Sequence, residues 1–307
     1  MLVPAACLTF ARVVEPHASF WLLAEGFTPL AIVLYGGAAL LLGVRLVLGR
    51  RWWTWAVAGV ALAGLVAHSW WFAPEVTGAN PPPADGADTL VVMTANIAQG
   101  DGDPIELVHR ASDEHVDLLV VEEITAADLA DMERSGIGDL LPYRVGRPGT
   151  SGTGTMVFSR VELGAGERTD TTNDGWIVTM GDLTVIATHP QAPTQPDTWS
   201  DDHAALLAAV RAHRPDLVLG DFNATNDHAP MRALADAGYR DVGELANEGW
   251  QPTWPANDRW APLPGLSFPA AQIDHVLVGE RMAAIGQHTV EIPGSDHRAV
   301  VALVARK

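Results

Sequence analysis

The stretch DLVLGDFN, residues 216–223, places a short apolar run directly before Gly220, Asp221, Phe222 and Asn223. A brief apolar run bounded by turn-forming residues is typical of a buried β-strand. Asp221 and Asn223 would then lie at the end of that strand, where polar side chains can serve a site instead of a core. The same arrangement, an apolar run next to polar residues, recurs on both sides of this stretch.

Short β-rich runs and helical patterns share residues 89–307. Each run is flanked by Gly, Pro, Asp or Asn, which favours short strands. The mixture predicts an α/β (α+β) domain with many strands. We expect strands at 89–96, 117–121, 154–159, 183–188, 216–219, 273–278 and 299–304, and helices at 104–115, 126–134, 201–212 and 230–237.

Polar side chains stand at the ends of most of these expected strands. Clustered together, carboxylate, amide and imidazole groups would bind a hard cation and a phosphate. A donor set rich in oxygen suits Mg²⁺ or Mn²⁺ better than a metal that prefers thiolates. The residues concerned are Asn96, Glu122, Glu123, His189, Asp221, Asn223, Asp274, His275, Asp296 and His297.

Six short motifs occur in a fixed order: T-x-N, D-x-x-x-x-E-E, T-H, G-D-F-N, I-D-H and S-D-H. This ordered set resembles the endonuclease/exonuclease/phosphatase family, which includes nucleases similar to deoxyribonuclease I. The resemblance covers about residues 89–304. It implies a four-layered α/β sandwich of two packed β-sheets flanked by helices, with the site at one end of both sheets.

The resemblance also implies a metal site. Glu123 matches the metal-binding glutamate of the family, with Asn96 beside it and Asp296 as a further contributor. The implied ion is Mg²⁺ or Mn²⁺. Glu122 stands where the family usually has glutamine, which leaves open whether Glu122 or Glu123 is the ligand. Because side chains alternate along a strand, one of the two is expected to face the site and the other to face away.

Five further residues match catalytic positions of the family. Asp221 and Asn223 match the pair that positions the attacking water and the phosphate, and His189 matches the histidine that contacts the phosphate. His297 matches the catalytic histidine, and Asp274 matches the carboxylate that orients it. A carboxylate that fixes one imidazole tautomer suits the pair for proton transfer.

The N-terminal region contains two apolar runs, at 27–48 and 52–72. Each is long enough to cross a hydrocarbon core of about 30 Å as a helix. Tryptophans stand at both ends of the second run, which is typical of membrane interfaces. Residues 1–72 are therefore predicted to be a membrane anchor, with residues 1–14 as a further membrane or interfacial segment.

Arg45, Arg50 and Arg51 form the densest basic cluster of the N-terminal region. The positive-inside rule places this cluster in the cytoplasm, so everything after Phe72 would lie outside. Residues 73–88 contain four prolines and read as a linker. The expected organisation is a multi-pass anchor in the cell membrane, a linker, and an extracytoplasmic domain at 89–307.

Net charge bears on the substrate. The chain carries −18, and residues 1–84 hold four arginines against three acids, so the remainder carries about −19. An acidic domain lacks the basic footprint of most nucleic-acid binders. We expect a phosphodiesterase acting on a phospholipid headgroup or another phosphoester near the membrane. The alternatives are an extracytoplasmic endonuclease on DNA or RNA, and a non-catalytic binding module on the same fold.

Other histidines and tryptophans have weaker assignments. His203, His213 and His228 are expected at the surface, and no role follows for His275. The segment 250–269, rich in Pro and Trp, is expected to be a long surface loop. Five tryptophans are candidates either for a substrate groove or for packing, namely Trp176, Trp199, Trp250, Trp254 and Trp260.

Overall fold

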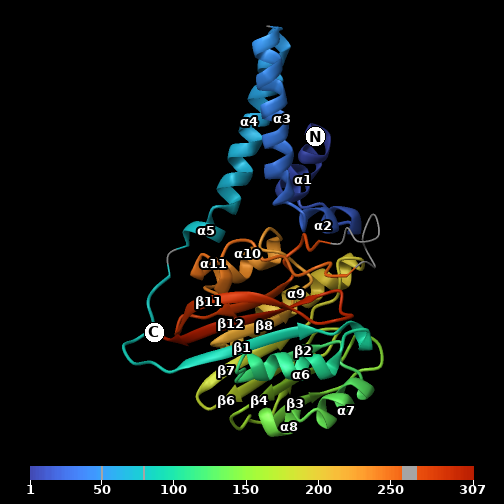
Figure 1. Ribbon diagram of the computed structural model, residues 1–307, viewed down its shortest axis with the longest axis vertical. Helices are drawn as coiled ribbons and strands as arrows, with labels where there is room; N and C mark the ends of the chain where they lie inside the picture. Colours follow the sequence, from blue (N-terminus) through green and yellow to red (C-terminus); the bar gives the residue numbers. More distant parts are fainter. Residues whose placement is uncertain (50, 79, 258–267) are drawn as a thin grey trace.

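The computed structural model describes residues 1–49, 51–78, 80–257 and 268–307. Two β-sheets stack face to face between layers of helix, and a pair of long N-terminal helices projects from one side (Figure 1). Part of the predicted loop at 250–269 and Arg50 of the predicted basic cluster lie outside the described residues.

The first sheet has the strand order β11-β12-β1-β2-β4-β3 within the described residues. Only β1 and β2 run parallel, and their register sets Asn96 opposite Glu122. The strands are β1 (Thr89–Asn96), β2 (Leu118–Glu122), β3 (Tyr143–Arg147), β4 (Thr155–Ser159), β11 (Met282–Glu291) and β12 (Arg298–Arg306).

The second sheet has the order β5-β6-β7-β8-β10-β9, again counted over the described residues. Only β7 and β8 run parallel, and β10 pairs antiparallel to β8 with Asp274 opposite Asp221. The strands are β5 (Glu167–Arg168), β6 (Trp176–Met180), β7 (Leu183–Thr188), β8 (Leu217–Asp221), β9 (Arg240–Asp241) and β10 (Asp274–Val278).

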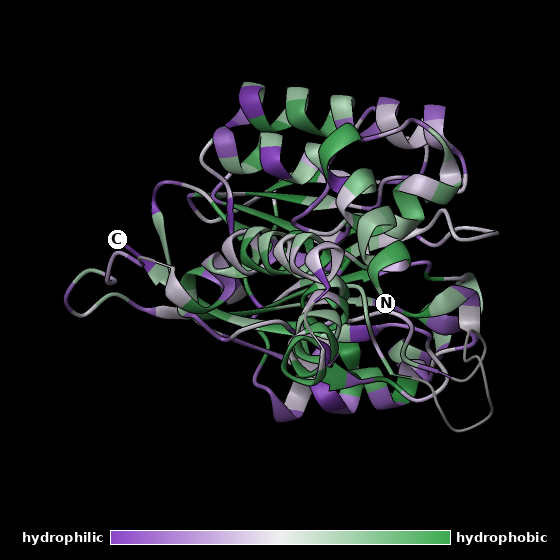
Figure 2. Cartoon of the chain, turned by 90° about the horizontal axis from the view of Figure 1, so that it is seen from above, coloured by the Kyte–Doolittle hydropathy of each residue, from purple (hydrophilic) through white to green (hydrophobic). Residues whose placement is uncertain are grey.

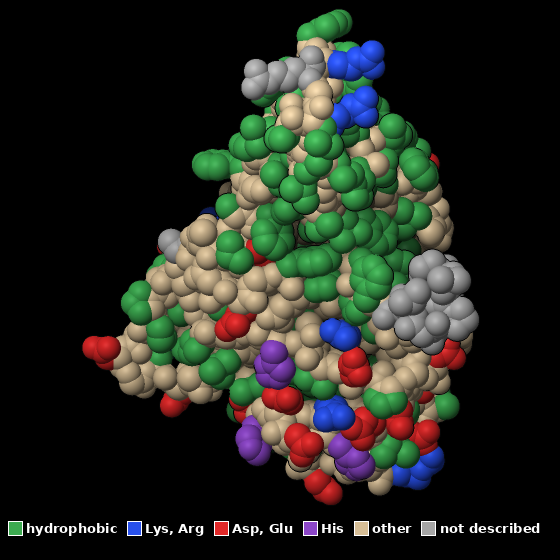
Figure 3. Space-filling model, turned by 45° about the horizontal axis from the view of Figure 1, so that its top comes forward, with side chains coloured by type: hydrophobic (Ala, Val, Ile, Leu, Met, Phe, Trp, Pro, Cys, Tyr) green, Lys and Arg blue, Asp and Glu red, His purple; other side chains and the backbone are tan. Residues whose placement is uncertain are grey.

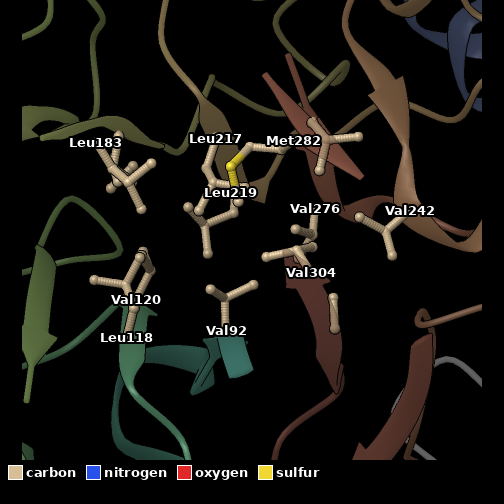
Figure 4. Packing of buried hydrophobic residues seen from close by; sticks show 14 of the residues in the cluster. Val92, Leu118, Val120, Leu183, Leu217, Leu219, Val242, Val276, Met282 and Val304 are labelled. Carbon is tan, nitrogen blue, oxygen red and sulfur yellow. The ribbon is translucent and has the colours of Figure 1, made fainter. Parts of the chain in front are cut away.

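The main core lies between the two sheets. Every second residue of the central strands points into this layer, as expected for the two-residue period of a β-strand. Val92 and Val120 of the first sheet face Leu217, Leu219 and Val276 of the second (Figure 4). Each of these five side chains is fully buried. Continuous packing of branched side chains therefore holds the sheets together.

Helices cover the two outer faces and complete four layers. α6 (Pro104–Asp113), α7 (Ala126–Arg134) and α8 (Ile137–Leu140) pack on the first sheet, and α9 (Pro196–His213) and α10 (Ala229–Asp236) pack on the second. The short α11 (Val242–Ala246) closes one edge of the central core. The predicted four-layered α/β sandwich is confirmed.

The sequence patterns found the central strands and missed several edge strands. β3 and β5 are largely exposed, and β9 has two residues. β11 mixes buried and exposed positions and has an irregularity in its pairing between Ala284 and Gly286. Edge strands bury one face at most, so they lack the continuous apolar runs that mark central strands. β6 was also missed, although it is mostly buried.

Five helices precede the sandwich. They are α1 (Leu2–Val14), α2 (Ser19–Glu25), α3 (Leu30–Leu48), α4 (Trp52–Phe72) and α5 (Pro74–Thr77). α3 and α4 are long and apolar enough to cross a membrane, and only 17% and 11% of their apolar windows are buried. Their side chains give the protruding part a largely apolar surface, in contrast to the charged globular part (Figure 3).

α3 and α4 form a hairpin, seen nearly end-on from above in Figure 2. Tyr35 of α3 is buried against α4, where a Cβ on Gly64 would come within 2.5 Å of its ring. Tyr35 also hydrogen-bonds Thr9 of α1 at 2.8 Å, and Thr9 bonds His68 of α4 at 3.0 Å. α1 therefore packs against both long helices as a third member of the bundle.

The predicted linker at 73–88 begins with α5, which docks on the sandwich. The amide of Gly249 donates to the Glu75 carbonyl at 3.0 Å, and Asn247 Nδ2 donates to the Gly78 carbonyl at 3.1 Å. Further along, the amide of Ala84 donates to the Arg306 carbonyl at 2.9 Å. The segment is thus attached at several points.

The inter-sheet core predicts a strong response to truncation. Leu219→Ala should lower the free energy of unfolding by about 2–5 kcal/mol, because it leaves a cavity between two sheets that cannot close independently. Thermal unfolding of the full chain in detergent, followed by near-ultraviolet circular dichroism, measures this change. Val161→Ala, at a side chain that is 50% exposed, is the matched control. Equal melting temperatures for the two variants would contradict the assigned core.

Candidate active site

The candidate site lies where the inter-sheet core gives way to polar residues. Asn96 follows Val92 on the inward face of β1, and Asp221 follows Leu217 and Leu219 on the inward face of β8. Asp274 opens β10 directly opposite Asp221. Strand alternation therefore aims carboxylate and amide groups from both sheets into the same end of the sandwich.

Asp221 is at the centre of the hydrogen-bond network. Its Oδ1 accepts from the amide of Asn223 at 2.8 Å, and its Oδ2 accepts from Asn96 Nδ2 at 3.0 Å. His189 Nε2 lies 3.6 Å from the same Oδ2. The side chain of Asn223, whose φ is 49°, donates to the Pro190 carbonyl at 3.1 Å, so it ties the end of β8 to the residue after His189.

Gly220 explains the first letter of the GDFN motif. Its φ is +151°, and a Cβ there would stand 1.9 Å from the Thr188 carbonyl oxygen on β7. No side chain fits in that space. The close approach of β7 and β8 therefore requires glycine immediately before Asp221.

The two adjacent glutamates both point toward the space between the sheets. Glu122 follows the strand alternation, is fully buried, and accepts from Thr94 Oγ1 at 2.7 Å. Glu123 adopts a left-handed backbone with φ 57°, which reverses the alternation and brings its Oε1 to 3.2 Å from Asn96 Nδ2. The expectation that one of them faces away is wrong, because the strand ends between them.

Glu123 is the glutamate at the accessible side of the cluster. Its Oε1 lies 3.8 Å from His189 Nε2, and its side chain is 19% exposed. Burial raises the pKa of Glu122 well above its usual range, and the hydrogen bond from Thr94 only partly opposes this effect. Burial thus favours the protonated form of Glu122, which is the form that resembles the neutral glutamine usual at this position.

His297 and Asp274 form a buried pair. His297 Nδ1 lies 2.9 Å from Asp274 Oδ2, and His297 Nε2 points toward Asp221 Oδ2 at 3.9 Å. Ser295 fixes this arrangement, since its Oγ accepts from the amide of His297 at 3.0 Å and donates to the Asn96 carbonyl at 2.7 Å. The S-D-H motif thus anchors the histidine to the end of β1.

The electrostatics of the site are those of crowded, buried carboxylates. Burial and the neighbouring charge of Asp274 raise the pKa of Asp221 to about 6. Burial alone would lower the pKa of His297, but the charges of Asp274 and Asp221 and the Asp274 hydrogen bond raise it to about 10. Burial lowers the pKa of His189. In the absence of metal, His297 therefore carries a proton at neutral pH while His189 is neutral.

The donor set fits a divalent cation. Glu123, Asp221 and Asp274 form no ion pair with Lys or Arg among the described residues, so their charge is balanced only by imidazoles. Ligand atoms of Asp221, Asp274 and His297 lie within 4.8 Å of one another. Asn96 Oδ1 accepts from the amide of Ala98 at 2.9 Å, which fixes the orientation of the Asn96 side-chain amide. Its Nδ2 therefore faces the carboxylates and donates to both Glu123 and Asp221.

Asp296 lies at the rim of the site. Its Oδ1 is 4.0 Å from His297 Nε2, and its Oδ2 accepts from Trp254 Nε1 at 3.4 Å. Trp254 thus contacts a candidate site residue with its ring nitrogen, as does Trp199, whose Nε1 donates to the Asn223 carbonyl at 3.0 Å. Trp199 packs in the core, and Trp176 donates to the Thr155 carbonyl at 2.8 Å, while Trp260 lies outside the described residues.

Some residues differ from their predicted positions. His203 and His228 are buried, not exposed, because α9 and α10 turn them toward Trp199. His275 is a buried structural residue held by Asp241 at 2.7 Å and the Ala224 carbonyl at 2.9 Å. The sequence also gave no role to Thr253, whose Oγ1 accepts from the amide of Asp274 at 3.3 Å.

A family model for the endonuclease/exonuclease/phosphatase family matches residues 93–297. The chain belongs to this family. It is accordingly a hydrolase of phosphoester bonds, and the enzymes of the family depend on divalent metal ions. The matched segment spans every candidate site residue named above. No curated protein sequence matches the chain significantly.

Solved structures share the fold at low sequence identity. TDP2 of D. rerio, complexed with a single-strand DNA product, is 14% identical with a TM-score of 0.57, over 71% of this chain and 99% of that chain. The 3′ phosphatase NExo from Neisseria, bound to a product DNA hairpin, is 20% identical with a TM-score of 0.55, over 69% and 98%. An AP endonuclease from Archaeoglobus fulgidus is 16% identical with a TM-score of 0.55, over 69% and 98%.

The His297–Asp274 pair predicts a shift that can be measured without turnover. Asp274→Asn should lower the pKa of His297, because it removes a negative charge that stabilises the imidazolium. Titration of labelled histidines by NMR in EDTA measures the shift. Asp241→Asn, at the buried pair with His275 and without a contact to His297, should leave the pKa of His297 unchanged. An unaltered His297 pKa in Asp274→Asn would refute the proposed coupling.

Proposed function

We propose that this protein is a membrane-anchored, metal-dependent phosphodiesterase that hydrolyses a phosphoester at the outer face of the membrane. One observation carries the proposal. Asp221 lies between His189 and His297, and His297 is backed by Asp274, in a buried cluster at the shared end of two sheets. This arrangement offers a carboxylate for water and an imidazolium for a leaving oxygen.

The residue roles follow from charge and position. Glu123, with Asp296 at the rim, would hold Mg²⁺ or Mn²⁺, which supplies neutralisation of the phosphoryl oxygens when bound. Asn96, beside them, orients the carboxylates of Glu123 and Asp221 through its Nδ2. Asp221 and Asn223 orient the attacking water and the phosphate, and His189 contacts the phosphate. Each of these roles is the one that the family assigns to the matching residue, and the fold brings these residues to one end of the sandwich.

Proton transfer divides between two residues. Asp221, with a pKa of about 6, is ionised at neutral pH and can accept a proton from water. His297, with its pKa raised to about 10, is protonated and can donate to the departing oxygen. Asp274 orients the imidazole through Nδ1. Two groups in opposite protonation states at one pH are what acid–base catalysis requires.

The exposed apolar helices support a membrane location. A pair of long helices whose apolar residues are mostly unburied would be insoluble as a free surface, so α3 and α4 are proposed to span the bilayer. The basic residues Arg45 and Arg51 flank the turn between them, at the end away from the sandwich. The positive-inside rule then places the sandwich outside the cytoplasm.

The substrate we favour is a phospholipid headgroup or another phosphoester held near the membrane. The anchor keeps the site within reach of the bilayer, and the net charge of about −19 outside residues 1–84 disfavours long nucleic acids. Nucleic acid is the second candidate, because two structures with this fold contain DNA products. A non-catalytic binding module is the third, and the complete site disfavours it.

Hydrolysis by the full chain in nanodiscs tests the proposal. We expect turnover of bis-p-nitrophenyl phosphate and of at least one phospholipid with Mg²⁺ or Mn²⁺, and none with EDTA. His297→Ala should reduce kcat by about 10²–10⁴-fold, because proton transfer to the leaving group is lost. Plasmid DNA is tested in parallel at salt concentrations from about 50 to about 300 mM. A nuclease that binds the phosphate backbone should lose affinity steeply over this range.

The matched control is His288→Ala, which removes an exposed histidine on β11 that is far from the cluster. It should keep the activity of the unaltered chain. Preference for DNA over every lipid would favour the nuclease alternative. Absence of turnover for all substrates by folded, metal-loaded protein would rule out the proposed phosphodiesterase and leave the binding module.

Membrane orientation gives a separate prediction. Alkaline phosphatase fused after Lys307 should be active, because it folds only outside the cytoplasm, while a fluorescent protein fused there and active only in the cytoplasm should stay dark. An inactive alkaline phosphatase together with a fluorescent reporter would place the sandwich in the cytoplasm and contradict the proposed orientation. Fusions in the turn between α3 and α4 provide the reciprocal control.

A further inference from the structure

The loop that follows the GDFN motif is held by the N-terminal helices. Residues 224–228 lead from Asn223 to the start of α10. Three consecutive residues of this loop, Asn226, Asp227 and His228, each contact a different N-terminal helix. Segments separated by more than 150 positions in the sequence therefore meet directly behind the candidate site.

His228 makes the most buried of these contacts. Its Nε2 lies 2.8 Å from the carbonyl oxygen of Leu22 in α2, and its Nδ1 accepts from the amide of Thr225 at 2.9 Å. The Thr225 amide must donate to Nδ1, so the neutral ring carries its proton on Nε2 and donates it to Leu22. Burial lowers the pKa of His228 to about 4, so this tautomer persists at neutral pH.

Asp227 and Asn226 contact the other two helices. Asp227 Oδ1 accepts from Arg12 Nε of α1 at 2.9 Å, with both side chains about 15% exposed. The Arg12 guanidinium in turn lies 5.1 Å from the centre of the Trp71 ring in α4. Asn226 Nδ2 donates to Glu75 Oε1 of α5 at 3.1 Å.

An apolar contact supports the same loop from behind. Leu22 of α2 is 5% exposed and belongs to one buried cluster with Phe222, Ala224 and Trp199. Phe222 is the residue between Asp221 and Asn223. Trp199 Nε1 donates to the Asn223 carbonyl at 3.0 Å, and its ring packs edge-on against His228 with centroids 5.5 Å apart. Leu22 thus completes the hydrophobic support of the motif.

We infer that α1, α2 and α5 are positioning elements of the active site, which they hold through a clamp made of Asn226–Glu75, Asp227–Arg12 and His228–Leu22. The inference rests on the proposed function for Asp221 and Asn223. The N-terminal region is then more than a tether, because its seating on the sandwich sets the order of the catalytic loop. His228 and Asp227 act through the loop and do not touch the reacting atoms.

The physical reason lies in the geometry of the loop. Asn223 has a φ of 49°, in the left-handed region that asparagine tolerates but does not prefer strongly. Such a backbone persists when its surroundings fix it on both sides. Asp221 fixes it from the front through the Asn223 amide, and the clamp fixes the residues that follow. Release of the clamp should loosen residues 221–228 while the two sheets stay folded.

Two substitutions of His228 separate its two hydrogen bonds. His228→Gln can still reach the Leu22 carbonyl with its amide nitrogen but loses the acceptor for Thr225. His228→Asn keeps an acceptor near the Thr225 amide but cannot reach Leu22. Asp227→Asn removes the charge pair with Arg12 and is an independent probe. His17→Ala is the matched control, since it removes an exposed contact with Asp197 between the same two parts of the chain.

Each variant is prepared as the full chain in nanodiscs and studied by two measurements. Hydrogen exchange of the amides at 221–228 reports the order of the loop and needs no substrate. Hydrolysis of bis-p-nitrophenyl phosphate with Mg²⁺ reports kcat and KM. We expect His228→Asn and Asp227→Asn to speed loop exchange at least about tenfold and to lower kcat about tenfold at nearly constant KM. His228→Gln should retain more kcat than His228→Asn, and His17→Ala should match the unaltered chain.

Exchange and kcat within twofold of the unaltered chain for both His228→Asn and Asp227→Asn would overturn the inference. So would a His228→Gln variant more impaired than His228→Asn, because the local bond to Thr225 would then dominate. If the unaltered chain hydrolyses nothing, the proposed function fails, and hydrogen exchange still decides whether the clamp orders the loop.

Discussion

The packing of two sheets through alternating side chains is the constraint on which the rest of the structure depends. Because every second residue of the central strands must point inward, the final residues of β1 and β8 and the first residue of the antiparallel β10 reach a common end of the layer. Apolar side chains fill the middle of that layer, and Asn96, Asp221 and Asp274 close it. The core and the candidate site are therefore two parts of one layer, and the rigidity of the first positions the second.

Crowding of carboxylates gives this layer its chemistry. Burying Asp221 and Asp274 beside each other would be costly without a compensating charge, since their mutual repulsion is poorly screened. His297 supplies part of it as an imidazolium, and a divalent cation would supply the rest. Burial raises the pKa of Glu122 and so favours its uncharged form, which lessens the repulsion. The cluster therefore has an excess of negative charge that a divalent cation would neutralise.

The N-terminal helices add a second support to the same site. Short loops between strands and helices are usually the most mobile part of a domain, and catalytic residues on them need external fixation. Here the fixation comes from α1, α2 and α5, which also carry the chain toward the long apolar hairpin. The N-terminal helices and the sandwich therefore share one hydrophobic cluster through Leu22. The proline-rich segment between them in the sequence does not separate them in space.

The sequence by itself determined the central strands, the outer helices and the family, because buried strands need continuous apolar runs and the site needs fixed polar residues after them. It also determined which residues could carry chemistry. Only the tertiary structure shows that both glutamates face the space between the sheets and that Glu123 is the accessible one, since the left-handed turn at Glu123 depends on where β2 ends. It likewise decided that His203 and His228 are buried and that the residues after GDFN contact α1, α2 and α5. These contacts join segments more than 150 residues apart in the sequence. A local sequence pattern cannot show them, because they depend on how the whole chain packs.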